Sequence, residues 1–407
     1  MLSEMKNKFT LLIVLFCSVH LFGLYYRLGE VYYFILDGIG FSIIFLEIFL
    51  RKNSITHKSH LFEKPLILLY IALFISTISC YYFHGQNIIP TIIAMRYFLY
   101  LSIYFLLIQL NIEKNWIESF IIIGSILYII VFLTQVLVYP IEIVDIGRID
   151  EFNRGLLRFR IEGAGFLMLA GLLSLNRVFV NKKWIFSIFY ILCMIGIFML
   201  GFRTLLATAI FSSFILLIRI SNKPFTLLLN SIFIAIILSG LYYVPIVNSY
   251  IKEVVEVTNN ESDMSDDYIR YLTFDFYYHD VNKNNYTLIL GNGFPQEDSE
   301  YGKYVQGEGV EDNGYIFQDI GLVGFGIIYG VITLIVYLYL SIKAIFTKTK
   351  REDVYLSCYF IYLITSSFTT TEIYRAGIFG VISLALYLID TSAMNLKLIP
   401  QKKKIPM

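Results

Sequence analysis

Long apolar runs constrain this chain more than any other feature of its sequence. Stretches of about 17–25 residues with few or no charges recur along it, and each is long enough to cross a lipid bilayer. Hydrophobic residues make up 57% of the chain and charged residues 15%, whereas roughly 25% of the residues in a soluble domain are charged. Lipid offers the backbone no hydrogen-bond partners, so each run must be helical. The sequence therefore predicts an all-α polytopic membrane protein.

About twelve transmembrane helices can be counted at these lengths. The runs cover residues 9–26, 31–50, 64–83, 91–110, 117–139, 161–179, 184–201, 204–220, 225–246, 314–342, 354–371 and 375–392. One large hydrophilic insert separates the ninth run from the tenth. We therefore expect three parts: helices 1–9 in residues 1–246, an extracytoplasmic loop in 247–313, and helices 10–12 with a cytoplasmic tail in 314–407.

The basic residues favour a single orientation. Lysine and arginine in short connections mark the cytoplasmic side of a membrane protein. Here they precede the first run, follow the even-numbered runs and end the chain, as Lys6, Arg51, Lys114, Arg177, Arg219, Lys343 and Lys402 illustrate. Both termini are therefore predicted to be cytoplasmic and the insert to lie outside.

The insert is acidic, which restricts the partners that it can bind. It holds fourteen acidic and four basic residues, so electrostatics argue against nucleic acid. The four cysteines lie within apolar runs and have neither metal-ligand nor disulfide spacing. No companion is evident for any of the five histidines, His20 and His84 included. We predict no metal site and no cofactor.

Arginines on the predicted outer face are the first candidates for binding an anion. A guanidinium grips phosphate or carboxylate through two donors at once, which lysine cannot do. Arg203 lies in a very short link at the membrane boundary, where a charge needs a partner or a watery cavity. Arg158 and Arg160 border the membrane before the sixth run, and Arg375 borders the last run. Arg270 lies in a helix-like stretch bracketed by acids, so a structural ion pair is an equal alternative for it.

The return from the insert to the membrane carries two acids. Asp312 and Asp319 are seven residues apart, a spacing that places both on one face of a helix spanning 314–342. Asp312 would also suit as the N-cap of that helix, whereas Asp319 lies deeper and needs an arginine from another span. Upstream, residues 288–290 are strand-like and run into a tight Gly-Asn-Gly-Phe-Pro turn.

Two further acids lie within the second run. Asp37 and Glu47 are predicted to form structural ion pairs, because a charge at membrane depth is costly without a partner.

Taken in order, these motifs resemble the bacterial O-antigen polymerase and O-antigen ligase superfamily of membrane glycosyltransferases. The similar features are a basic outer connection at 154–160, the short-link Arg203, an arginine-bearing helix at 267–276, the Gly-x-Gly turn at 291–293, and Asp312-Asn313 followed by Asp319 and a Gly-x-x-Gly at 321–324. The resemblance implies a GT-C-like fold. Ligases usually carry histidine where this chain has Asp312, so the polymerase branch is favoured.

The resemblance implies metal-independent polymerisation of undecaprenyl-pyrophosphate-linked oligosaccharide repeats into O-antigen, capsular or exopolysaccharide. The expected place is the outer face of a bacterial cytoplasmic membrane. Arg203 and Arg270 would stabilise the leaving pyrophosphate, and Asp312 would be the base for the acceptor hydroxyl. The expected substrate-binding residues are Arg158, Arg160, Asn313, Tyr315, Asp319 and Arg375. The expected partners are the lipid bilayer and the lipid-linked oligosaccharide, with a chain-length regulator as a further candidate.

Two other functions remain open from the sequence. A flippase would move a lipid-linked oligosaccharide across the membrane without chemistry, but no internal repeat typical of transporters is evident. A ligase-type transferase would attach finished chains to an acceptor.

Overall fold

The computed structural model describes residues 2–24, 29–51, 60–146, 159, 161–221, 266–370, 372–374 and 377–398. Within these ranges the named elements are all helices and none is a strand, which confirms the all-α prediction. The longer helices are α1 (Leu2–Ser18), α2 (Glu30–Leu50), α3 (Glu63–His84), α6 (Lys114–Val138), α7 (Gly165–Asn181), α8 (Phe186–Met199), α9 (Arg203–Ile220), α16 (Val331–Phe346), α17 (Val354–Ser367) and α18 (Ile378–Leu398). The shorter ones are η1 (His20–Gly23), α4 (Ile88–Ala94), η4 (Arg96–Ser102), α5 (Ile103–Leu110), α12 (Asp266–Asp275), η5 (Phe276–Val281), α13 (Asn285–Leu290), α14 (Glu300–Tyr304), η6 (Val305–Glu311), η7 (Phe317–Ile320), α15 (Gly321–Tyr329), η8 (Arg351–Asp353) and η9 (Glu372–Tyr374).

Fewer helices than predicted are suited to cross a membrane as single rods. In the described part, five are long and apolar enough, and the number rises to seven if each of two bent pairs forms one span. At 1.5 Å per residue, helices of 14 residues such as α8 and α17 fall short of the roughly 20 residues that a span needs. The predicted ninth run, 225–246, lies outside the described residues. A membrane protein is supported, whereas twelve spans and a GT-C-like fold stay predictions.

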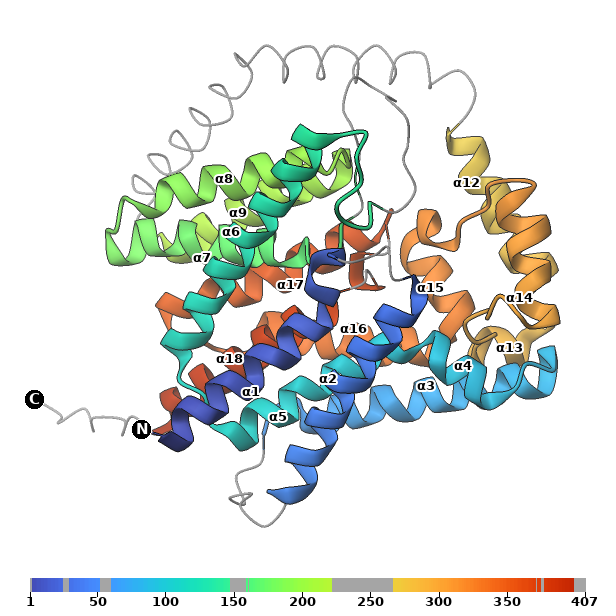
Figure 1. Cartoon of the computed structure of the whole chain (residues 1–407), viewed down its shortest axis with the longest axis horizontal. Helices are drawn as coiled ribbons and strands as arrows, with labels where there is room; N and C mark the ends of the chain where they lie inside the picture. The colour runs from blue at the N-terminus through green and yellow to red at the C-terminus, as the bar shows by residue number, and fades with distance from the viewer. Residues whose placement is uncertain are drawn as a thin grey trace, which may run out of the picture.

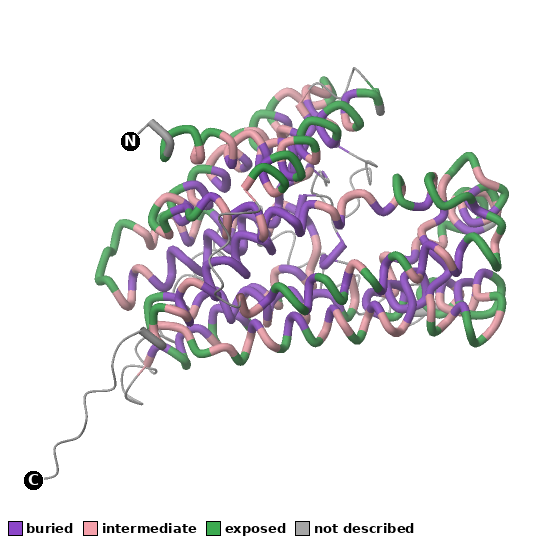
Figure 2. Tube along the Cα trace, turned by 90° about the horizontal axis from the view of Figure 1, so that it is seen from below, coloured by how far each residue is buried: buried purple, intermediate pink, exposed green. Residues whose placement is uncertain are grey.

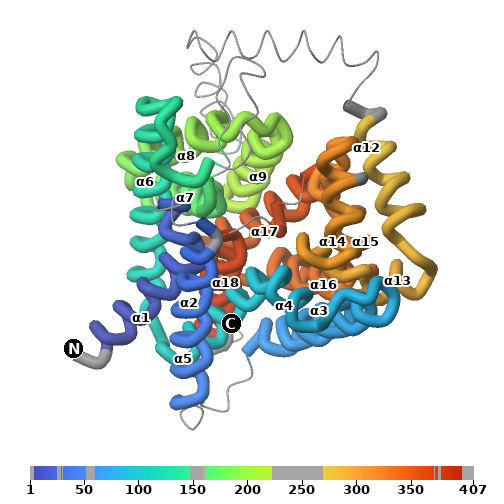
Figure 3. The backbone as a smooth tube through the Cα atoms, turned by 45° about the vertical axis from the view of Figure 1, so that its right-hand side comes forward, coloured from blue at the N-terminus to red at the C-terminus, as the bar shows by residue number. Residues whose placement is uncertain are grey.

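The helices form groups around a buried centre. Helices α6–α9 gather at one end and α12–α15 at the other, with α17 and α18 between them (Figures 1 and 3). In the apolar window of α18 83% of residues are buried, against 17% in that of α2, so α18 is a core helix and α2 is peripheral. Buried residues gather toward the middle of the molecule, and exposed ones lie on the outer turns of the helices (Figure 2). Exposed side chains of α2 and α3 include Phe49, Leu50 and Phe74. Such apolar outer faces suit lipid.

The predicted tenth span is broken. Its halves, Phe317–Tyr329 and Val331–Phe346, meet at an angle of 119° at Gly330. The backbone of Gly330 has φ +92°, and a Cβ there would lie 2.5 Å from the carbonyl carbon of Leu290. Only glycine permits so close an approach with a positive φ. The fourth run is bent as well, by 64° between Ile88–Ala94 and Arg96–Leu110.

The Gly-Asn-Gly turn donates hydrogen bonds to carbonyls that have no helical partner because of this break. The backbone N–H groups of Asn292 and Gly293 donate to the carbonyls of Ile327 (3.4 Å) and Ile328 (2.8 Å), and the Asn292 amide also donates to Ile327 (2.9 Å). Carbonyls at the end of a helix need such donors when buried. Hydrogen bonds between segments far apart in sequence therefore stabilise the bend.

Two local predictions about this region are wrong. Residues 288–290 belong to helix α13, whose Asn284 cap accepts hydrogen bonds from Tyr286 and Thr287, so they form no strand. Asp312 and Asp319 do not share a helix face. Asp312 is the C-cap of η6, whereas Asp319 lies in the 3₁₀-helix η7 before α15.

Candidate functional site

A cavity of about 780 Å³ lies among segments that are distant in sequence. Its walls come from the start of α2, the bend between α4 and η4, the connection between α6 and α7, the start of α9, the segment after α13, and the residues before α15 and α18. The predicted topology places every one of these segments on the outer face. The hydrogen bonds of Asn292 and Gly293 hold the neighbouring residues 294–298, which form part of the wall.

The described lining is acidic and aromatic, with a single guanidinium. The carboxylates are Asp145, Glu162, Glu297, Asp298, Asp319 and Glu372, the phenols are Tyr33, Tyr97 and Tyr374, and the guanidinium is that of Arg96. Glutamine amides at 296, 306 and 318 add further donors and acceptors. Aromatic walls with a few convergent polar groups are typical of small-molecule sites.

Arg96 lies at the bend between α4 and η4. Its Nε donates to Oδ2 of Asp37 at 2.6 Å, its Nη1 donates to the Ile93 carbonyl at 3.0 Å, and its Nη2 donates to the Tyr97 hydroxyl at 2.9 Å. The guanidinium also lies 4.6 Å from the ring centroid of Phe34 and 4.5 Å from that of Tyr97. A planar cation stacked between two rings is held in one orientation.

Behind this wall lies a buried cluster of charges. His20 lies between two carboxylates: its Nδ1 is 2.5 Å from Oε2 of Glu162, and its Nε2 is 2.9 Å from Oδ1 of Asp37. The Tyr100 hydroxyl donates to the same Asp37 oxygen at 2.6 Å. The predicted structural pairing of Asp37 is confirmed, with Arg96 and His20 as its partners.

The backbone that carries His20 is strained. His20, Leu21 and Phe22 have φ of +44°, +51° and +60°, a left-handed conformation that costs non-glycine residues about 1–3 kcal/mol each. Three such residues in succession persist only where the surroundings fix them, and they are most often found at functional sites. The contacts of His20 with Glu162 and Asp37 supply part of that fixation.

Some predicted site residues lie at the cavity. Asp319 lines it directly. Arg203 is the first residue of α9 and is flanked by the lining residues Phe202 and Leu205. Asp319 thus lies at the same cavity as Arg96, whereas Arg203 is adjacent in sequence to its lining.

Other predicted site residues lie away from the lining. Asp312, Asn313 and Arg270 have exposed side chains and do not line the cavity. Tyr315 packs its ring 5.6 Å from that of Phe276 and accepts a hydrogen bond from Tyr277 through its carbonyl, 3.3 Å away. Helix α12, which carries Arg270, is confirmed and packs against η7. The catalytic and binding roles of these residues stay predictions.

Three predicted residues, Arg158, Arg160 and Arg375, lie outside the described residues. In sequence, Arg375 directly follows the lining residue Tyr374.

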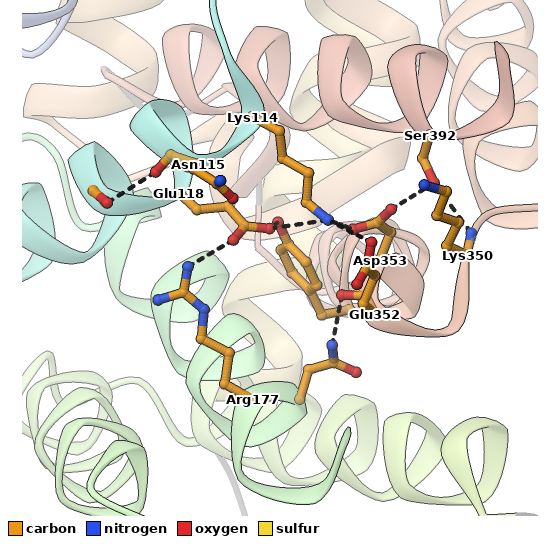
Figure 4. A network of polar contacts seen from close by, with 11 residues as sticks. Lys114, Asn115, Glu118, Arg177, Lys350, Glu352, Asp353 and Ser392 are labelled. Atoms are coloured by element: carbon orange, nitrogen blue, oxygen red, sulfur yellow. Dashed lines mark hydrogen bonds and ion pairs between the residues drawn. The ribbon is translucent and has the colours of Figure 1, made fainter. Parts of the chain in front are cut away.

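A second polar cluster occupies the predicted cytoplasmic face (Figure 4). Lys114 forms ion pairs with Asp353, with Glu352 at 3.4 Å and with Glu118 at 3.6 Å. Arg177 pairs with Glu118 at 2.6 Å. These contacts join α6, α7 and η8.

The same cluster reaches α18 and α17. The Ser392 hydroxyl donates to Asp353 at 2.6 Å, and the Tyr355 hydroxyl donates to Glu118 at 3.0 Å. Burial raises the pKa of Asp353, although the Lys114 ammonium and the Ser392 hydroxyl act in the opposite direction. The cluster ties helices together, and its residues are not among those that line the cavity of about 780 Å³.

In comparisons with known proteins, no family model matches the chain and no curated protein matches it. Among the described residues, no group of three or more His, Cys, Asp or Glu side chains is arranged to hold a metal ion.

Sequence reasoning missed Arg96 and was wrong to leave His20 without a companion. Arg96 lies inside an apolar run near its outer end, which is itself a signal, because a buried arginine requires a partner. The partners of His20 are 17 and 142 residues away, so no local pattern links them.

Proposed function

We propose that the protein lengthens a polysaccharide on the outer face of a bacterial cytoplasmic membrane. The substrates are oligosaccharide repeats linked to undecaprenyl pyrophosphate. The growing glycan leaves its lipid pyrophosphate and is joined to a hydroxyl of the next lipid-linked repeat. This proposal rests on the sequence resemblance and on the chemistry of the cavity.

The observation that carries the proposal is the makeup of the cavity. It combines tyrosine rings, carboxylates and amides with one fixed guanidinium, all beside helices suited to lipid. Sugars present apolar ring faces and many hydroxyls, which such a lining complements. The cavity volume, about 780 Å³, lies within the roughly 300–1,000 Å³ range of small-molecule sites.

Arg96 supports the binding of a phosphate group in that cavity. A guanidinium has five N–H donors, and among the described residues three of them are used, by Asp37, Ile93 and Tyr97. The other two make no hydrogen bond within the described part of the chain and are the donors that we assign to the phosphate. Arg203 begins α9 beside the same wall and is the second candidate for the leaving pyrophosphate.

The proposal is tested by the glycans that accumulate in cells carrying Arg203→Ala. Loss of a group that stabilises the departing charge lowers a rate by roughly 10²–10³-fold. We therefore expect lipid-linked single repeats to accumulate on the outer face while long chains disappear. Arg219→Ala is the matched control, because Arg219 lies at the opposite end of α9 and donates a hydrogen bond to the Ser357 hydroxyl. Unchanged chain length in Arg203→Ala would contradict the proposal.

One observation favours a flippase as the second candidate function. Two apolar helix pairs are broken, at 64° and 119°, and discontinuous helices often form the binding sites of transporters. The same experiment distinguishes the functions. Single repeats retained on the inner face of the membrane would indicate a flippase, and long chains of normal length left unattached would indicate a ligase.

A further inference from the structure

A row of charged side chains leads from the protein interior to the cavity wall. The side chains of His20 and Asp37 are 0% and 3% exposed, whereas that of Glu162 is 17% exposed and lines the cavity. Of the three side chains in the Asp37–His20–Glu162 row, Glu162 is the one that lines the cavity and can contact a ligand there.

The hydrogen bonds link the protonation states of the three side chains in this row. An ionised carboxylate only accepts hydrogen bonds, so each His20 nitrogen that faces one must donate. With both carboxylates ionised, His20 carries both ring protons and is a cation between Glu162 and Asp37. Arg96 supplies a second cation at Asp37, and two cations then balance two carboxylates. Such compensation is what allows charges to be buried.

The other titratable groups that face the row are phenols and one thiol. The rings of Tyr33 and Tyr97 lie 4.8 Å and 5.6 Å from that of His20, and Tyr100 donates to Asp37. Cys17 is buried beside Asp37. Tyr33 donates to Asp145, a further carboxylate of the cavity lining.

We infer that Glu162 is the general base of the transfer reaction and that His20 is its positioning residue; this rests on the proposed function. His20 contacts Oε2 of Glu162 from the buried side, and Glu162 lines the cavity, so Oε1 is the oxygen that we assign to the ligand. A carboxylate whose orientation is fixed from behind by a buried partner is preorganised to face a ligand. The strained left-handed backbone at residues 20–22 is explained by the same requirement, because it places the imidazole between the two carboxylates.

The reaction balances with these groups alone. The acceptor hydroxyl transfers its proton to Oε1 of Glu162 while its oxygen forms a bond to the anomeric carbon of the donor sugar. The bond between that carbon and the pyrophosphate oxygen breaks, and the lipid pyrophosphate leaves with the electron pair. The proton then passes from Glu162 to the pyrophosphate or to water in the cavity.

The test uses the purified full chain in lipid nanodiscs with a defined undecaprenyl-pyrophosphate-linked oligosaccharide. Glu162→Gln keeps the size of the side chain but cannot accept the proton, so kcat should fall about 100-fold with KM within about threefold. Glu162→Asp should restore part of the rate, because it returns a carboxylate to the same position. Glu300→Gln is the control, because Glu300 is exposed in α14 and does not line the cavity.

A second readout does not depend on activity. In ¹⁵N-histidine-labelled protein at about pH 8, well above the ordinary histidine pKa of roughly 6.5, one histidine should still carry both ring protons. That signal should change in Glu162→Gln and persist in Glu300→Gln.

The possible results distinguish the role of Glu162 from the proposed elongation activity. If the wild-type protein forms no glycan longer than the substrate, both the proposed function and the role of Glu162 are overturned. A wild-type protein that elongates the substrate while Glu162→Gln keeps more than about a third of its kcat overturns the inference alone. A rate loss in Asp312→Asn in place of Glu162→Gln would also overturn the inference. A His20 ring that carries a single proton would overturn it as well.

Discussion

At the scale of single residues, the Arg96 side chain connects the cavity wall to the charges buried behind it. It pairs with Asp37 through Nε and is stacked between Phe34 and Tyr97. Only a planar fork of donors can make the ion pair and both ring contacts at once. The same contacts hold Asp37 against His20, so the position of Glu162 depends on Arg96 through two intervening groups.

Arg96→Lys should therefore lower the proposed elongation activity even though the charge is kept. The ammonium loses the forked arrangement of donors to Asp37, Ile93 and Tyr97 and the contacts with both rings, so we expect at least a tenfold drop in kcat/KM, about 1.4 kcal/mol of transition-state stabilisation. Steady-state elongation with the lipid-linked oligosaccharide measures it. Arg51→Lys is the matched control, because Arg51 forms an ion pair with Glu47 away from the cavity. Equal rates in Arg96→Lys and wild type would contradict this role.

The candidate site was predictable from the sequence only in part. Asp319 and Arg203 stood out because a charge near an apolar run needs a reason, and both lie at the cavity or directly beside its lining. Asp312 stood out for the same reason, yet its side chain is exposed. Glu162 and His20 carry no local signal, because their pairing joins residues 142 apart.

At the scale of elements, the break between α15 and α16 shapes the outer half of the molecule. The Gly330 backbone packs directly on Leu290 and Gly291. The backbone N–H groups of Asn292 and Gly293 donate to carbonyls at the end of α15 that have no partner within the helix. The apolar pattern of 314–342 predicted a helix there and could not predict the bend. The bend depends on donors supplied by a segment about 35 residues upstream, as the Asn292 bond to Ile327 shows.

Gly330→Ala should destabilise the protein. The added Cβ would lie 2.5 Å from the Leu290 carbonyl carbon and would force alanine to φ +92°, so we expect a loss of about 3 kcal/mol or more. The midpoint of unfolding in detergent measures it. Gly307→Ala is the control, because nothing lies within 4 Å of a Cβ at Gly307. A midpoint for Gly330→Ala equal to that of Gly307→Ala would contradict the described packing.

At the scale of the whole molecule, two polar clusters lie on opposite predicted faces and have different characters. The outer one surrounds a cavity with acids, phenols and Arg96. The inner one joins α6, α7, α17 and α18 through Glu118, Arg177, Lys114 and Asp353 (Figure 4). The lysine and arginine pattern predicted which residues would lie inside, but not that they would form ion pairs across helices, since charge alone sets orientation.

The inner cluster should contribute to stability and not to activity. Glu118→Gln leaves Arg177 and Lys114 without their shared carboxylate, so we expect a loss of about 3 kcal/mol. Glu352→Gln should cost less than about 1 kcal/mol, because the Glu352 side chain is 47% exposed. Unfolding midpoints and elongation rates of both variants measure the two effects. Equal midpoints, or a loss of elongation at wild-type stability, would contradict a purely structural role.

The central claim is glycosyl transfer between lipid-linked repeats, and one assay tests it directly. The purified wild-type protein in nanodiscs is incubated with an undecaprenyl-pyrophosphate-linked oligosaccharide and no other enzyme, and the products are separated by length. We predict a ladder of glycans that differ by one repeat, with free undecaprenyl pyrophosphate released at each step. Lipid-linked repeats that remain single, with no undecaprenyl pyrophosphate released, would contradict it.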